Sequence, residues 1–284
     1  MKKLFMAVIA VMMTVSVSAQ FYIYLSNGEE LVVDSISMVI PGAIGGEFSV
    51  SGTETVQFSR GNLQYQASTD TWRFAPKQYE IVGSGNNNIS PTYDGWIDLF
   101  GWGTGNNPTL TSDEYEDYAT FSEWGANKIS NGGYKANLWR TLSRDEWKYI
   151  FYDRGNAATL FGFGSVNGVN GLIILPDNWN LPEGASFTHG SYKNNLKNNF
   201  TQNTYTAEEW VVMETNGAVF LPVSGGTRMG NSISNASADW GIYWATTPED
   251  NGYMSSYSLI FQDNSLSTSS LWLRFIGTHV RLVR

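Results

Sequence analysis

Cysteine is absent from all 284 residues of the chain. Without thiols the chain forms no disulfide bond, offers no thiolate to a metal ion, and has no cysteine on which a bacterial lipid anchor could be built. Histidine is nearly absent as well, because only His189 and His279 occur. Since histidine is the most common base for an activated nucleophile, little nucleophilic catalysis is available to the chain. Without disulfide bonds, the stability of the fold has to come from packing.

Positive charge is also scarce. The chain has 17 Lys and Arg against 26 Asp and Glu, for a net charge of -9, and charged residues make up only 15% of it. An acidic chain of this kind is repelled by phosphate backbones and by anionic membrane surfaces. We therefore expect no nucleic acid partner.

The longest apolar run is short and stands at the start. Met1-Lys2-Lys3 is followed by the uncharged run 4–17 and then by Val17-Ser18-Ala19. This order of basic, apolar and small residues is typical of a secretory signal peptide, so we predict a signal peptide at 1–19, cleaved after Ala19. The run is shorter than the ~20 residues that cross a membrane, so no membrane insertion is expected. The sequence predicts a protein that is secreted or held at the cell surface.

Glycine and aromatic residues are plentiful, with 29 Gly, 11 Trp, 15 Tyr and 15 Phe. Such a composition predicts many turns and short strands around an aromatic core, with helix as the minority element. Residues 20–46 predict a small β hairpin, turning at Asn27-Gly28 and ending in a linker at Pro41–Gly46. The main domain is then expected at 47–284. Its first part predicts a β meander from Phe48 to Phe74, followed by a packed bend at Gly95–Gly103.

Two segments carry helix signals. Ser143-x-x-Glu146-Trp147 and Thr206-x-x-Glu209-Trp210 are capping boxes in which the hydroxyl and the Glu each satisfy a free backbone amide. We expect each Trp to face the core. Closing glycines are expected at Gly155 and Gly217, where a left-handed residue is cheapest as glycine. An apolar run follows each helix and ends in Leu-Pro, at Pro176 and at Pro222.

Several motifs are more typical of loops and turns than of catalytic or cofactor sites. The Asn-rich stretches 86–88 and 193–203 predict surface loops. Gly162–Gly168 has its third glycine one residue too late for a dinucleotide fingerprint, so turn glycines are expected. His189 is expected in a solvated loop, and His279 as a packed or edge-exposed residue of a strand.

The order of the motifs resembles a known family. The helix start at Thr141–Trp147, Phe220-Leu221-Pro222 with Gly226 and Arg228, Gly241-x-Tyr243-Trp244-x-Thr246-Thr247, and Gly277-x-x-Val280-Arg281 together look like the C-type-lectin-like fold. More narrowly, they are similar to the branch of formylglycine-generating (sulfatase-modifying) enzymes, secreted Bacteroidetes proteins and variable proteins of diversity-generating retroelements.

The resemblance covers roughly residues 141–284 with its motifs and the region Trp72–Gly103 more loosely. It implies an α+β, C-type-lectin-like domain with two helices and a twisted antiparallel sheet. The enzymes of that branch work through cysteine, or through copper held by cysteine, so their chemistry is excluded here. Leu282 stands where the pattern usually has Pro, and Ala245 where the retroelement proteins tend to have Ser. If the resemblance to those proteins is close, it implies that the loops of the last quarter are diversified.

The last quarter has short strand-like runs separated by loops rich in Ser, Thr, Asn and Tyr, a pattern typical of a surface that displays residues. We predict a secreted, non-enzymatic binding protein whose loops between Ser224 and Ser270 contact a glycan or a cell-surface protein, with no cofactor and no metal. The predicted ligand-binding residues are Arg228, Asp239, Trp240, Tyr243 and Tyr253.

Two alternatives stay open. A glycan hydrolase would use carboxylates such as Asp113, Glu116, Asp145 or Glu146, which must face each other across a deep cleft. A structural subunit of a surface assembly would attach through the N-terminal hairpin. A calcium site at the acidic cluster 113–117 is a further option, although no Asp-x-Asp-x-Asp-Gly loop is present.

Overall fold

The computed structural model describes residues 21–24, 30–33, 41–191, 198–250, 252 and 254–284. The chain divides into two compact units, Met1–Val39 and Ile40–Arg284. The predicted signal peptide and the Asn27-Gly28 turn lie outside the described residues.

The first unit contains the predicted hairpin strands. β1 (Phe21–Tyr24) and β2 (Glu30–Val33) run antiparallel, with Phe21 opposite Val33. The predicted linker belongs to the second unit instead. Ala43 forms a β-bridge with Ser59, and Ile44 is only 4% exposed within the core. Packed turns use the same glycine and proline signals as linkers, which is why the sequence placed the boundary too late, near Glu47.

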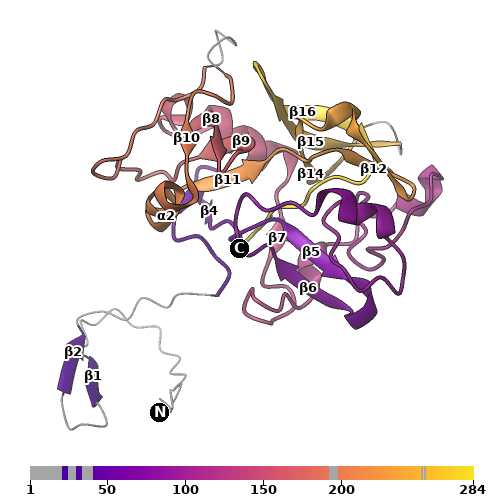
Figure 1. Ribbon diagram of the computed structural model, residues 1–284, viewed down its shortest axis with the longest axis horizontal. Helices are drawn as coiled ribbons and strands as arrows, with labels where there is room; N and C mark the ends of the chain where they lie inside the picture. Colours follow the sequence, from indigo (N-terminus) through magenta and orange to yellow (C-terminus); the bar gives the residue numbers. More distant parts are fainter. Residues whose placement is uncertain (1–20, 25–29, 34–40, 192–197, 251, 253) are drawn as a thin grey trace. The chain divides into compact units, whose positions relative to one another are not determined.

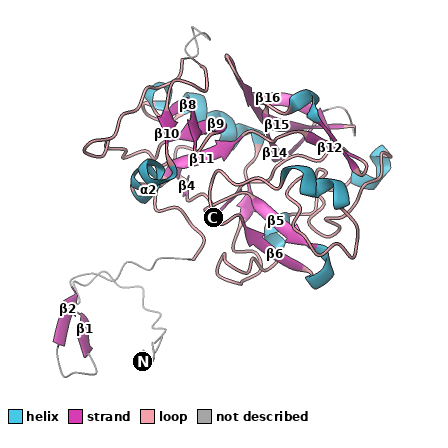
Figure 2. Cartoon of the chain, viewed as in Figure 1, coloured by secondary structure: helices cyan, strands magenta, loops and turns pink. Residues whose placement is uncertain are grey.

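The second unit mixes a few helices with several small, mostly antiparallel sheets, which agrees with the predicted α+β class (Figures 1 and 2). Its strands are β3 (Phe48–Ser49), β4 (Thr55–Val56), β5 (Leu63–Gln66), β6 (Thr71–Phe74), β7 (Arg140–Thr141), β8 (Phe161–Val166), β9 (Val169–Ile174), β10 (Thr204–Tyr205), β11 (Val219–Pro222), β12 (Thr227–Met229), β13 (Ser232–Ser234), β14 (Gly241–Pro248), β15 (Ser255–Gln262), β16 (Ser265–Leu273) and β17 (Leu282–Val283). Its α-helices are α1 (Arg144–Lys148) and α2 (Ala207–Thr215), and α1 continues as a π-helix, Tyr149–Asp153. Its 3₁₀ turns are Ala67–Thr69, Gly83–Asn88, Tyr115–Tyr118, Trp124–Ala126, Ala157–Thr159 and Asn235–Ser237.

The predicted meander is confirmed as two hairpins, β3–β4 and β5–β6. The aromatic bend after them is packed without a regular strand, and it buries Ile97, Phe100 and Trp102. The chain end closes this region, because β17 pairs with β7 and Val283 bridges Phe58.

Both capping boxes are confirmed. Ser143 accepts a hydrogen bond from the Glu146 amide, and Thr206 accepts one from the Glu209 amide. In each box the Glu carboxylate accepts a hydrogen bond from the backbone amide of the cap residue. The tryptophans that follow, Trp147 and Trp210, are each 1% exposed.

The two helices end differently. Gly217 takes the expected left-handed backbone, with φ of 94°. Gly155 does not, because the left-handed residue there is Asn156, with φ of 58°. Asparagine tolerates this region better than most residues, so a glycine one position away misled the sequence prediction.

The apolar runs after the two helices lie side by side. β9 and β11 pair antiparallel, with Ile174 opposite Val219, inside the four-stranded sheet β10-β8-β9-β11. The β8–β9 hairpin turns at Asn167-Gly168, where φ is 50° and 80°, so the glycine-rich segment is a turn as expected.

The Asn-rich stretches are less exposed than predicted. Asn86 is fully buried, and Asn198 and Asn203 are 2% and 5% exposed. Each side-chain amide pairs with backbone groups, for example Asn203 Nδ2 with Phe163 O at 2.7 Å. A buried amide of this kind replaces missing backbone partners in irregular segments, a use that composition alone does not reveal. None of the helices within the described residues has the length and apolar character needed to cross a bilayer.

Candidate functional site

The structure separates the predicted ligand-binding residues into two groups. Asp239 is exposed and Trp240 is half-buried, so both reach the surface. Arg228 and Tyr243 are each 0% exposed. The prediction that these two side chains meet a ligand is therefore wrong. Tyr253 lies outside the described residues.

Arg228 ties together segments that are distant in sequence. Its Nε donates to Leu99 O at 3.1 Å, Nη1 to Gly230 O at 2.8 Å, and Nη2 to Leu110 O at 3.1 Å. Burial lowers the pKa of Arg228, while the neighbouring Tyr118 acts in the opposite direction. With three donors used on backbone carbonyls, this guanidinium holds the segments at Leu99, Leu110 and Gly230 together.

Tyr243 sits in the same interior. Its hydroxyl donates to Pro222 O at 2.8 Å and accepts from Asn62 Nδ2 at 3.2 Å. Burial is the main cause that raises the pKa of Tyr243 above its ordinary value. Residues 241–245 of β14 are all buried, so the strand has no solvent face there.

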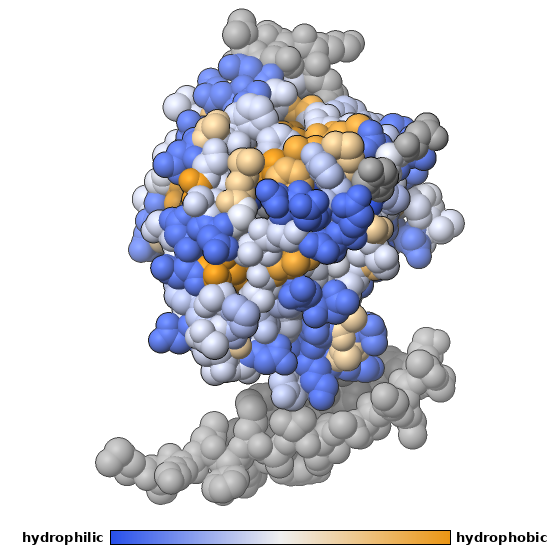
Figure 3. Space-filling model, turned by 90° about the vertical axis from the view of Figure 1, so that its right-hand side faces the viewer, coloured by the Kyte–Doolittle hydropathy of each residue, from blue (hydrophilic) through white to orange (hydrophobic). Residues whose placement is uncertain are grey.

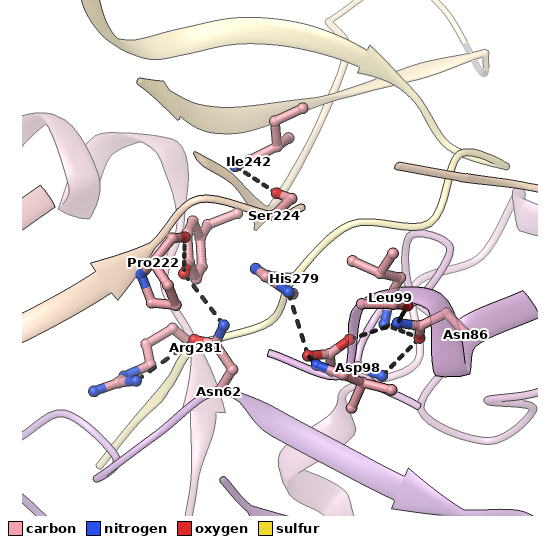
Figure 4. A network of polar contacts seen from close by, with 12 residues as sticks. Asn62, Asn86, Asp98, Leu99, Pro222, Ser224, Ile242, His279 and Arg281 are labelled. Atoms are coloured by element: carbon pink, nitrogen blue, oxygen red, sulfur yellow. Dashed lines mark hydrogen bonds and ion pairs between the residues drawn. The ribbon is translucent and has the colours of Figure 1, made fainter. Parts of the chain in front are cut away.

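A buried Asp–His pair lies next to Tyr243, and the sequence prediction missed it (Figure 4). His279 Nε2 is 3.4 Å from Asp98 Oδ2, and both residues are 0% exposed. Asp98 also accepts from Asn86 Nδ2 at 2.8 Å and from the Val82 amide at 2.9 Å. The sequence prediction for His279 was a packed or edge-exposed strand residue, and only the first of these options implied burial. The partner Asp98 carries no local signal, because it comes from the aromatic bend.

Arg281 extends this network toward β11. Its Nη2 donates to Gln78 Oε1 at 2.7 Å and its Nη1 lies 3.5 Å from Asn62 Oδ1. Burial lowers the pKa of Arg281 to about 10, with Tyr243 acting in the opposite direction. Gln78 in turn bonds the Phe220 amide and the Ala218 carbonyl. The network thus joins distant stretches of the chain.

The Asp–His pair is not placed to act as a catalytic base. Neither ring nitrogen of His279 has a hydrogen-bond partner of good geometry among the described residues, and the pair is sealed from solvent. A catalytic base has to reach both its nucleophile and a substrate. The buried polar network is therefore better suited to fixing the core.

Of the carboxylates that a hydrolase would use, two are held in ion pairs and two are exposed. Glu146 caps α1 and forms an ion pair with Arg140 at 2.6 Å, and Asp145 pairs with Arg144 at 3.0 Å. Asp113 and Glu116 are exposed. No group of three or more His, Asp or Glu side chains that could hold a metal ion occurs in the described part of the chain.

A hollow of about 430 Å³ beside α2 also contains acids. Glu208 and Glu214 line it, together with Lys77, Tyr79 and Val211. The two acids are six positions apart on one helix, so they project about 120° apart around its axis at 3.6 residues per turn. They do not form the opposed pair that glycoside hydrolysis needs.

The surface feature that the structure does assemble is a pair of tryptophans. Trp240 stands directly before β14 and Trp272 lies near the end of β16, yet their ring centroids are 6.2 Å apart with planes inclined at 54°. Both rings are half-buried. We call this pair the Trp surface. Sequence reasoning proposed Trp240 and missed Trp272, because the two residues are far apart in the chain and only the tertiary structure brings their rings together.

Strand register does not by itself explain the contact, because Trp272 lies opposite Ser256, whose partner in β14 is Pro248, at the other end of the strand from Trp240. β14, β15 and β16 form one antiparallel sheet, in which Ile242 lies opposite Ile260 and Ser256 opposite Trp272. Figure 3 views the side of the molecule that carries β12 and β14–β16, and it shows hydrophobic groups gathered in the upper part with hydrophilic residues around them.

The charge near the sheet of the Trp surface is mixed, because Arg144 lies over the Tyr257 ring and Arg274 donates to Ser256 Oγ. Residues 229–273 contain no Lys or Arg, but they contain Asp239, Glu249, Asp250 and Asp263.

Comparisons of the chain with family models, with curated proteins and with solved structures find no match.

Proposed function

We propose that the chain is a secreted, non-enzymatic binding protein with a C-type-lectin-like domain, which presents the Trp surface and the loops between Ser224 and Ser270 to a glycan or to a cell-surface protein. The observation that supports it best is the half-buried Trp240–Trp272 pair. Aromatic faces provide a large contact area at little entropic cost, and they dominate the energy of many interfaces.

Rigid support beneath the pair strengthens the proposal. Ile242 and Trp244, in the strand that follows Trp240, are at most 1% exposed, and Trp244 Nε1 donates to Phe100 O at 2.7 Å. At Gly241 a Cβ atom would lie 1.9 Å from the Phe261 ring, so the strand start is held closely against the core. A pre-organised surface loses less entropy when it binds.

The mixed α+β architecture and the two capped helices support the C-type-lectin-like assignment. The chain has no cysteine for the chemistry of the related enzymes. Binding without catalysis is the function that these two observations support together.

A binding screen tests the proposal. The secreted chain is applied to glycan arrays and to surface-protein extracts, and each ligand found is titrated against Trp240→Ala and Trp272→Ala. We expect each variant to weaken binding about tenfold or more, as hot-spot tryptophans do. Trp179→Ala is the matched control, because Trp179 is also half-buried but lies outside β14–β16. Unchanged affinity in both test variants would remove the Trp surface as the site.

A further inference from the structure

The loop at 128–137 presents an exposed aromatic side chain. Tyr134 is 66% exposed, the largest fraction among the exposed large hydrophobic side chains that the structure describes. It lies outside any helix or strand. Single exposed rings are common on protein surfaces, so the backbone at this position is the more informative feature.

The backbone of Tyr134 is in the left-handed region, with φ of 52°. Five other non-glycine residues of the described chain have positive φ, and all five are Asn or Asp: Asp70, Asn137, Asn156, Asn167 and Asn264. Asn and Asp tolerate this region, whereas an aromatic residue there is strained. Glycine would take it without strain, as Gly133 does directly before, with φ of 89°. The chain thus keeps a ring where glycine would fit better, which indicates a use for the ring outside the fold.

The loop is held firmly beneath this ring. The Tyr134 amide donates to Ile129 O at 3.0 Å. The side-chain amide of Asn131 pairs with both backbone groups of Phe74, at 2.8 Å and 2.9 Å. Ile129 and Phe74 are each 0% exposed, so the loop is anchored in the core. A ring presented by a rigid backbone loses little entropy when it meets a ligand.

Positive charge gathers on the same loop. Residues 124–144 contain four basic residues and no Asp or Glu, although the whole chain has a net charge of -9. The two arginines among them form ion pairs with acids of α1. The two lysines, Lys128 and Lys135, are exposed and form no ion pair with a described residue. Lys128 Nζ lies 5.3 Å from the centroid of the Tyr134 ring, and Lys135 follows Tyr134 in the chain.

We propose that Tyr134, Lys128 and Lys135 bind an acidic glycan, whose sugar rings carry carboxylates. The tyrosine ring supplies a flat apolar face for the sugar, and the ammonium groups donate charge-assisted hydrogen bonds to its carboxylate. Exposed charges are screened beyond about 8–10 Å, so a ligand at this loop meets mainly the charge of the loop itself. This site is separate from the Trp surface and does not depend on the proposed function.

Charge density favours a glycan over nucleic acid. DNA carries one charge per ~1.7 Å of its axis, whereas an acidic glycan carries at most one carboxylate per sugar ring. All 26 acidic residues of the chain lie outside 124–144. They repel a sparse anion less than a dense one. Two lysines therefore suffice for a sugar acid.

Three polymers separate the two parts of the ligand. Polygalacturonate has a carboxylate on each sugar ring, its methyl ester keeps the ring without the charge, and polyglutamate keeps the charge without the ring. In affinity electrophoresis we expect the chain to bind polygalacturonate, and to bind each of the other two at least about tenfold more weakly. Binding should also weaken as salt is raised.

Tyr134→Gly separates binding from stability. Glycine relieves the strained φ, so this variant should unfold no earlier than the parent chain, while its affinity for polygalacturonate falls about tenfold or more. Asn137→Gly, at φ of 58° in the same loop, is the matched control and should keep full affinity. Lys128→Gln and Lys135→Gln should each weaken binding about threefold or more. Lys77→Gln, at an exposed lysine outside the loop, should not.

Three results would overturn the proposal. The first is an equal loss of affinity in Tyr134→Gly and Asn137→Gly, because the loop would then act through its conformation alone. The second is that neither polygalacturonate nor hyaluronate, another carboxylated glycan, binds, or that polyglutamate or an oligothymidylate binds more tightly than both. The third is a loss in Trp240→Ala with full affinity in Tyr134→Gly, which would support the proposed function and refute this site.

Discussion

At the scale of single residues, several polar side chains of this protein are buried and form hydrogen bonds within the core. Tyr243 illustrates this, because its position in an aromatic strand near the chain end suggested display, whereas its hydroxyl bonds Pro222 and Asn62 in the core. A tyrosine has the same local signature in either role. Only the partners that the fold supplies decide which role it has.

We expect Tyr243→Phe to lower the free energy of unfolding by about 1–3 kcal/mol, because it leaves the buried Pro222 carbonyl without its donor. Urea unfolding measures the change, and ligand affinity should stay the same. Tyr134→Phe is the control, since Tyr134 is 66% exposed. A normal stability together with lost binding would return Tyr243 to the ligand site.

Tyr205 predicts a dependence of stability on alkaline pH. Burial is the main cause that raises the pKa of Tyr205 to about 12, and nearby Glu209 adds to the effect. Between pH 10 and pH 12 the unfolded chain releases this proton while the folded chain keeps it, so stability falls as pH rises. We expect Tyr205→Phe to remove about 1–2 kcal/mol of that fall, reduced from the full shift because the site is partly screened. Unfolding curves at pH 9 and pH 12 that are displaced equally in both proteins would contradict it.

At the scale of elements, helices were predictable because their signals are local. A capping box depends on residues three positions apart, so both helix starts are visible in the sequence, and both are confirmed. The first helix end was not predictable to the residue, since Asn156 and Gly155 are neighbours and either can turn left-handed.

The α2 cap supplies a prediction. Thr206→Ala removes the acceptor for the Glu209 amide, which lies 3.2 Å from the hydroxyl oxygen. We expect a loss of about 1 kcal/mol in the free energy of unfolding. Thr53→Ala, at an exposed turn, serves as the reference and should change little. Equal stability of the two variants would show that the cap is dispensable.

The two glycines after the helices make a matched pair. At Gly217, φ is 94° and a Cβ would lie 2.7 Å from the Gly46 Cα, whereas at Gly155 a Cβ meets nothing within 4 Å. We expect Gly217→Ala to lower the thermal midpoint through a loss of more than about 1 kcal/mol, and Gly155→Ala to be neutral or stabilising. The reverse order in calorimetry would refute this account of the chain turn.

At the scale of the whole molecule, buried arginines join segments that the sequence keeps apart. Arg228 reaches Leu99 and Leu110, which are 129 and 118 positions away. Such contacts have no local pattern. The same is true of the Asp98–His279 pair and of the Trp surface.

We expect Arg228→Ala to cost at least about 3 kcal/mol, because three carbonyls lose a charged donor. The loops around Leu110 and Gly230 should then be cut faster by protease under native conditions. Arg60→Ala, at an exposed arginine, is the control. Unchanged cleavage in Arg228→Ala would mean that these loops are held by other contacts.

The sequence by itself determined the short-range features of this protein: the two helix starts, the hairpins, the turn at Asn167-Gly168 and the core tryptophans. Each depends on residues within a few positions of one another, where propensity and periodicity act. Tertiary structure alone decided which polar residues are buried and which tryptophans meet at the surface. These depend on contacts between distant segments, and those contacts exist only once the sheets have formed.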